Sequence, residues 1–182
     1  MRRGFRRSFR RALGEAPQVP AALQDANQLM ASGDYPAAAA AFEDLARLAE
    51  ARGGPHAPFF LMQAGRARLL IGEHGRSMAH FKHGLTLLAD AKRYTLFYRA
   101  GTRIAQELTA RKLDKEAQEI ANLVHHHTAA IAEMSTEPLP MVGHILPTHC
   151  PSCGGPVRSD ETDWIDERTV ECPFCGSPVR AE

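Results

Sequence analysis

The stretch GDYPAAAAAF at residues 33–42 recurs as GEHGRSMAHF at residues 72–81 and, more weakly, as KLDKEAQEIA at residues 112–121. Successive copies are offset by 39 and 40 residues. A repeat of this period is typical of stacked structural units that bury a shared core. Helix-favouring Ala, Leu, Gln, Glu and Arg dominate residues 19–134, and Pro stands there at segment boundaries. The sequence therefore predicts a mainly α fold over this range, with about three antiparallel helix pairs stacked as a solenoid.

Small residues recur in matching columns of the three units. They are Ala26, Gly65 and Ala105 in the first helix of each pair, and Ala38, Ser77 and Ala117 in the second. Phe42 and Phe81 share a third column, where Ala121 stands in the last unit. Small side chains allow two helix backbones to approach closely, and a large apolar side chain fills the space toward the next pair. The short turns within the pairs are predicted at Gly33 and Gly72, and the third unit lacks such a glycine.

These columns resemble the tetratricopeptide repeat, although that repeat is usually about 34 residues long and each unit here is longer. The resemblance implies a concave surface, made by the first helix of each pair, that binds peptides. The residues expected on this surface are Asn27, Met30, Phe59, Met62, Gln63, Arg66, Arg99, Arg103 and Gln106.

Some repeats of this family grip the terminal carboxylate of a partner with Lys, Asn and two further basic residues. Asn27, Arg99 and Arg103 stand at matching positions, Gln63 replaces an Asn, and Leu23 replaces the first Lys. The alternative interpretation is Arg on a solvated helix face. Loss of acidic-peptide binding on Arg99→Ala or Arg103→Ala would distinguish the two.

All four cysteines lie in the last 33 residues, in the phrases CPSCGGPV (150–157) and CPFCGSPV (172–179). Two C-x-x-C pairs separated by 18 residues are typical of a four-thiolate zinc site. Glycine after each pair supplies the positive φ of a tight turn, and four thiolates complete a tetrahedron with no open position. The sequence predicts one structural Zn²⁺ held by Cys150, Cys153, Cys172 and Cys175.

Other uses of the cysteines stay open at this point. A segment of this size with one Trp and one Phe needs a metal or a cross-link to fold. Without a secretion signal the chain is expected in a reducing compartment, which favours a metal over disulfides. Iron and a redox dithiol are the remaining alternatives, because rubredoxin-type sites also use paired C-x-x-C turns.

Residues 150–179 resemble zinc ribbons with doubled C-P-x-C-G turns, so residues 150–182 are assigned to such a unit. The resemblance implies two or three short strands, expected around 156–158 and 164–171. The segment RSDETDWIDERTVE (158–171) is too acidic to neutralise phosphates, which favours a protein contact or a purely structural role. Trp164 is expected to cover one side of the metal.

The segments on either side of the repeats differ in character. Residues 1–18 form a basic arm, expected to be flexible, whose charge comes from Arg2, Arg3, Arg6, Arg7, Arg10 and Arg11. Phe5, Phe9 and Leu13 make one apolar stripe, so an anionic membrane, a nucleic-acid backbone and the acidic C-terminal unit are alternative partners. The Pro-rich linker at 135–149 carries four apolar residues that predict packing along the solenoid. They are Met141, Val142, Ile145 and Leu146.

Composition limits the classes of function. With 182 residues, 24% of them charged, and a net charge of +1, the chain is not wholly disordered and contains no apolar run long enough to cross a membrane. The consecutive His125, His126 and His127 diverge by about 100° on a helix and cannot share one ion. Phosphate-binding and hydrolase motifs are absent from the sequence, so we expect no enzyme. The prediction is a cytoplasmic, protein-binding scaffold; the alternatives are a peripheral membrane or nucleic-acid accessory protein and a redox module.

Overall fold

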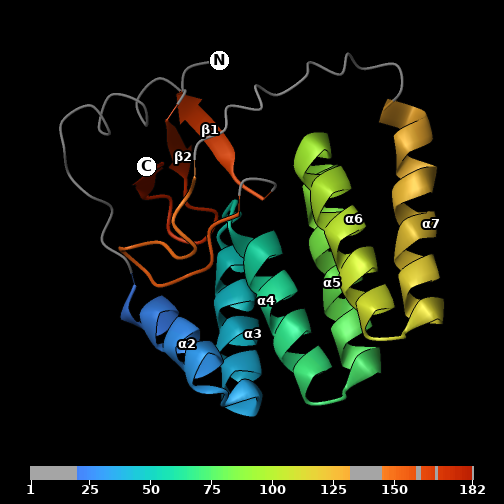
Figure 1. The fold of residues 1–182 in the computed structure, drawn as a ribbon, viewed down its shortest axis with the longest axis horizontal. Helices are drawn as coiled ribbons and strands as arrows, with labels where there is room; N and C mark the ends of the chain where they lie inside the picture. Colours follow the sequence, from blue (N-terminus) through green and yellow to red (C-terminus); the bar gives the residue numbers. More distant parts are fainter. Residues whose placement is uncertain (1–19, 132–144, 159–160, 167, 182) are drawn as a thin grey trace.

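A computed structural model describes residues 20–131, 145–158, 161–166 and 168–181, with side chains in the first range described as far as His127 (Figure 1). The basic arm at 1–18 and most of the linker, residues 135–144, lie outside this description, as do the predictions made for them. Among the described helices, none combines the length and the apolar character that crossing a bilayer requires.

The described chain is mainly helical, as expected. The helices are α2 (Ala21–Ser32), α3 (Tyr35–Ala51), α4 (Ala57–Leu70), α5 (His74–Asp90), α6 (Tyr94–Ala110) and α7 (Asp114–Ile131). Each helix packs against its neighbours in the chain, and Figure 1 shows them side by side in chain order, from blue α2 to yellow-orange α7. This packing agrees with a helical solenoid of three pairs, α2–α3, α4–α5 and α6–α7.

The repeated columns lie inside the core. Phe42 and Phe81 are fully buried, as are Ala26, Ala38 and Ser77. Burying a Phe side chain stabilises the fold by roughly 1.5 to 3 kcal/mol, so the two aromatic positions anchor the first two pairs. The periodicity of the sequence therefore marks the inward faces of the helices in the first two pairs, whereas Ala105 and Ala121 of the third are half-buried.

Gly65 shows how tightly the second pair is packed. A Cβ atom at this position would lie 2.7 Å from Phe81 Cε1 and 3.2 Å from the Ser77 backbone oxygen. We expect Gly65→Ala to lower the free energy of unfolding by about 1 to 3 kcal/mol, because α4 and α5 must move apart. Urea denaturation followed by circular dichroism measures the change.

Gly75→Ala is the matched control, because a Cβ there meets nothing within 4 Å near the start of α5. This control is expected to be neutral or stabilising by about 0.5 kcal/mol through helix propensity. Equal effects of the two substitutions would show that close packing is not what Gly65 provides.

The turn within each pair ends the first helix in the left-handed region. Gly33 has φ 84° and Gly72 has φ 78°, while Lys112 takes φ 62° at the corresponding position of the third pair. The hydrogen bonds are equivalent: Asp34 N donates to Leu29 O at 3.0 Å, and Leu113 N donates to Leu108 O at 3.0 Å. The third unit thus keeps the turn although its sequence lacks the glycine.

Lys112→Gly is expected to stabilise the protein by about 0.5 to 1 kcal/mol. A side chain in the left-handed region crowds the backbone, and glycine removes that strain at a smaller entropic cost. Thermal unfolding of the variant measures the gain. Lys115→Gly, in the first turn of α7, is the control and is expected to destabilise; a loss of stability on Lys112→Gly would contradict the assignment of strain.

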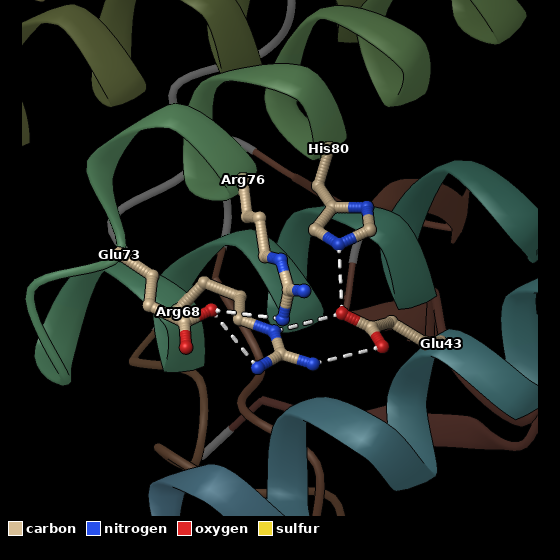
Figure 2. Close-up of polar contacts among 5 residues, drawn as sticks. All are labelled: Glu43, Arg68, Glu73, Arg76 and His80. Atoms are coloured by element: carbon tan, nitrogen blue, oxygen red, sulfur yellow. Dashed lines mark hydrogen bonds and ion pairs between the residues drawn. The ribbon is translucent and has the colours of Figure 1, made fainter.

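A network of charged side chains joins the first pair to the second (Figure 2). Arg68 on α4 binds Glu43 on α3 through two hydrogen bonds of 2.8 and 3.0 Å, and binds Glu73 at the start of α5 at 3.0 Å. His80 Nε2 lies 2.8 Å from Glu43 Oε1, and Arg76 Nη1 lies 3.3 Å from Glu73 Oε2. The two-pronged contact with the Arg68 guanidinium, helped by His80, lowers the pKa of Glu43 below its usual 4.5.

Because the pKa of Glu43 is lower in the folded protein, its ion pairs stabilise the fold above pH 4.5, and this stability is lost as pH falls through the lowered value. Glu43→Gln is therefore expected to cost about 1 to 3 kcal/mol at pH 7 and much less at pH 3. Urea denaturation of both proteins at several pH values gives the difference.

The neighbouring Asp44→Asn removes an ion pair with Arg47 in which both side chains are largely exposed. This control is expected to change the free energy of unfolding by less than about 1 kcal/mol at any pH. A Glu43→Gln effect that does not depend on pH would contradict the electrostatic explanation.

The C-terminal unit contains a small antiparallel sheet in the order β1–β2–β3, with β1 at Asp163–Asp166, β2 at Thr169–Glu171 and β3 at Pro178–Arg180. The predicted strand at 164–171 is a hairpin, because Asp166 Oδ1 accepts a hydrogen bond of 2.8 Å from Arg168 N and turns the chain. The strand predicted at 156–158 is reduced to a single bridge between His149 and Pro156.

Candidate metal centre and the helix face that carries it

The four cysteines converge although they come from two separate turns. Their sulfur atoms all lie within 4.8 Å of one another. Sγ of Cys150 is 3.8 Å from Sγ of Cys175, and Sγ of Cys153 is 3.7 Å from Sγ of Cys172. A disulfide needs about 2.05 Å, so these are free thiols.

The two turns that present the cysteines have the same backbone geometry. Gly154 N donates to Cys150 O and Gly176 N donates to Cys172 O, both at 2.9 Å. The two glycines have φ 72° and 73°. The amide of Gly155 lies 3.4 Å from Cys153 Sγ and donates to it. Each turn therefore aims two sulfur atoms at one point, and the amide of Gly155 adds partial positive charge there.

The spacing of the sulfur atoms suits a tetrahedral metal ion. Four sulfurs about 2.3 Å from one zinc ion would be about 3.8 Å from each other, against 3.7 and 3.8 Å here. Three of the four cysteines are buried and Cys175 is half-buried. These residues could bind a metal ion, and their geometry does not distinguish zinc from other thiophilic ions.

The thiols share protons unevenly. Hydrogen bonds from Cys153, Cys172 and Cys175 hold the pKa of Cys150 far below its ordinary value. The same contact with Cys150 raises the pKa of Cys153 and of Cys172. The contact with Cys150 also opposes ionisation of Cys175. The contacts of Cys175 with Cys153 and Cys172 outweigh it, and they lower the pKa of Cys175 to about 6. Without a bound cation, negative charge is therefore favoured on Cys150 and Cys175 and opposed on Cys153 and Cys172.

Side chains from the helices hold the backbone of both cysteine turns. Asn27 Nδ2 on α2 donates to Cys153 O at 2.9 Å, and this bond is buried. Gln24 Nε2 donates to Ser152 O at 3.1 Å. His56, just before α4, makes a contact of 2.7 Å between Nδ1 and Pro173 O. The cysteine cluster is therefore attached to the helices through the peptide groups next to its cysteines.

An aromatic contact adds to this attachment. The ring of Phe174 lies with its centroid 6.2 Å from that of Phe59 and 6.4 Å from that of Phe60, both on α4. Arg93 lies over the Phe59 ring at 5.3 Å and binds Asp163 of β1 at 2.9 Å. Phe174 stands inside the second C-x-x-C turn, so the same short segment supplies two cysteines and an anchor.

A buried ion pair lies at the centre of the contact between α4 and the C-terminal unit. Arg66 Nη2 is 2.8 Å from Glu161 Oε1, and the two side chains are 7% and 2% exposed. Arg66 also reaches Glu107 of α6 at 3.4 Å, while Arg158 and Arg103 lie 3.6 and 4.0 Å from Glu161. Burial opposes the charge of Arg66, but the carboxylates of Glu161 and Glu107 outweigh it and raise its pKa.

These contacts cover part of the surface that was expected to be open and concave. Of the residues expected there, five are buried: Asn27, Phe59, Met62, Gln63 and Arg66. Met30, Arg99 and Arg103 are half-buried, and Gln106 is exposed. Asn27, Phe59 and Arg66 contact the chain's own C-terminal unit. Peptide binding by this set stays a prediction, and in this arrangement the accessible members lie mainly on α6.

Sequence reasoning missed the residues that attach the C-terminal unit. Glu161, Phe174 and His56 follow no spacing that would indicate a contact with distant helices. Trp164, expected over the metal, is half-buried against the core and pairs with Val170 across the sheet. From the linker, Leu146 is half-buried against the shared core whereas Ile145 is 75% exposed, and packing of this segment along the solenoid stays a prediction.

Comparison with protein-family models, curated proteins and solved structures finds no match to this chain.

Proposed function

We propose that the chain is a non-enzymatic scaffold for protein partners, built as a tetratricopeptide-like solenoid with a zinc ribbon packed against the first helices of its pairs. The observation that carries the proposal is the convergence of Cys150, Cys153, Cys172 and Cys175 within 4.8 Å, in a unit bonded to the first helices of the pairs. The helical packing and the small sheet are what such a protein requires.

The four cysteine thiolates would hold one Zn²⁺, which supplies a cross-link between the two turns. Thiolates fill all four positions of the tetrahedron that zinc prefers, so the site has no place for water or substrate and is structural. The amide of Gly155 stabilises the charge on Cys153, and Asn27, Gln24 and His56 orient the turns from outside. The role of these residues is to position the ligands.

Metal analysis of the untagged protein tests the identity of the ion. We expect one zinc per chain and a colourless protein. One iron per chain and a red colour would contradict the zinc assignment. That result would instead support a rubredoxin-like redox module, because four thiolates also bind iron.

Partner binding is proposed on α6, where Gln106 is exposed and Arg99 and Arg103 are half-buried. A peptide with an acidic C-terminal tail is the defined probe, since guanidinium groups pair with carboxylates. We expect the full chain to bind it and Arg99→Ala to weaken binding about tenfold. Arg47→Ala, on the exposed side of α3, is the control and should bind as the wild type does; unchanged binding by Arg99→Ala would remove this surface from the proposal.

The basic arm supports a second candidate function. Residues 1–14 contain six Arg and no acidic residue, which suits an anionic membrane surface or a nucleic-acid backbone. Liposome sedimentation and a salt-titrated gel shift, each with and without residues 1–14, separate the two. Binding that survives removal of the arm would exclude both.

A further inference from the structure

A cleft of about 310 Å³ lies where the helices meet the C-terminal unit. Its walls come from α2, α4 and α6 on one side and from residues 149–158 on the other. Met30, Leu70 and Pro156 contribute apolar surface, while Arg66 and Arg158 contribute positive charge. The volume is at the lower end of the range for pockets that bind small molecules. The metal-binding sulfur atoms do not line it.

Arg158 is the unusual member of this lining. Its Nη1 atom is buried and has no hydrogen-bond partner among the described residues. The carboxylate oxygen Oε1 of Glu161 is 3.6 Å away from it, which is too far for a hydrogen bond. That oxygen is already bonded to Arg66 at 2.8 Å. Nη1 itself is closed to solvent, but the Arg158 side chain is 31% exposed and lines the cleft, so an acceptor on a ligand there would compensate a charge that lies 3.6 Å from Glu161.

The charges around Arg158 favour an anion as that ligand. Burial and repulsion by the nearby Arg66 lower the pKa of Arg158. Glu107 also lines the cleft, but it is engaged by Arg66 at 3.4 Å and by Arg111 at 3.9 Å. An anion beside Arg158 would therefore offset the repulsion between two guanidinium groups.

We propose that this cleft binds a small organic anion, with a carboxylate or phosphate group on Arg158 and an apolar body against Met30, Leu70 and Pro156. Because the cleft has walls from both parts of the chain, the ligand contacts the helices and the C-terminal unit together. Its binding then strengthens the attachment of that unit by mass action.

Calorimetric titration of the zinc-loaded full chain tests the proposal with three probes of similar body: phenyl phosphate, benzoate and neutral phenol. We expect saturable binding at one site for at least one of the anions and none for phenol. The anion that binds identifies the charged group. Arg158→Gln should weaken binding at least about tenfold, since a charge-assisted hydrogen bond is lost. Arg168→Gln, an exposed residue of the same unit, is the control and should bind as the wild type does.

A second variant tests the proposal even if Arg158→Gln fails to fold. Leu70 is 37% exposed at the edge of the cleft, so Leu70→Glu places a negative charge there without opening the core. We expect it to weaken anion binding by a similar factor. The proposal is overturned if neither anion binds saturably, if phenol binds as tightly, or if both variants bind like the wild type. None of these outcomes bears on the metal content, so this proposal and the proposed function fail separately.

Discussion

If the four cysteines hold a metal ion as proposed, its removal is expected to unfold the C-terminal unit while α2–α7 keep their helicity. The C-terminal unit has three short strands and a small apolar core around Val170, Val179 and Phe174. Such a unit cannot offset its loss of chain entropy without a cross-link. Binding of structural zinc to four thiolates contributes about 10 to 16 kcal/mol in apparent free energy at pH 7, so Cys172→Ser or exhaustive chelation should both abolish its fold.

The chain offers a direct probe of this change. Trp164 is the single tryptophan and lies half-buried on β1, so its fluorescence should shift to that of an exposed indole when the unit unfolds. Far-ultraviolet circular dichroism should keep most of its helical signal. Ser152→Ala alters the first cysteine turn but leaves all four thiols in place, and is expected to behave like the wild type. A Trp164 signal that survives chelation would show that the unit folds without metal.

Glu161→Gln is expected to destabilise the folded chain, in which the C-terminal unit packs on the helices, by about 3 to 5 kcal/mol. The substitution leaves the guanidinium of Arg66 buried with only the longer contact to Glu107, and an uncompensated buried charge is costly. Urea denaturation of the zinc-loaded chain measures the loss. Replacing the pair together, as Arg66→Met with Glu161→Leu, should recover most of the stability, because an apolar pair of similar volume avoids the desolvation of two charges.

Asp163→Asn supplies the matched control for this result. Asp163 pairs with Arg93 at 2.9 Å, also between the C-terminal unit and the helices, but its side chain is 59% exposed. Its loss should cost less than about 1 kcal/mol, because solvent screens exposed ion pairs. Similar costs for Glu161→Gln and Asp163→Asn would mean that burial does not govern the strength of these contacts.

Local patterns account for much of the architecture. The columns through Gly65 and Phe81 predicted the pairing of helices, because close approach needs small residues in register. The doubled C-x-x-C phrase predicted which four residues could hold a metal. The prediction of the strands was less accurate, since strands of three or four residues carry too little pattern to be recognised. The positive φ at the Lys112 turn could not be predicted, because lysine rarely adopts it.

By itself, the sequence determined the helical pairs, their inward faces and the two cysteine turns, because each depends on residues close together in the chain. Only the tertiary structure decided where the C-terminal unit rests. The bond from Asn27 to Cys153 O and the pair of Arg66 with Glu161 join residues 126 and 95 positions apart. No periodicity records such a contact, because it depends on the shape and charge of two surfaces that exist only after each has folded.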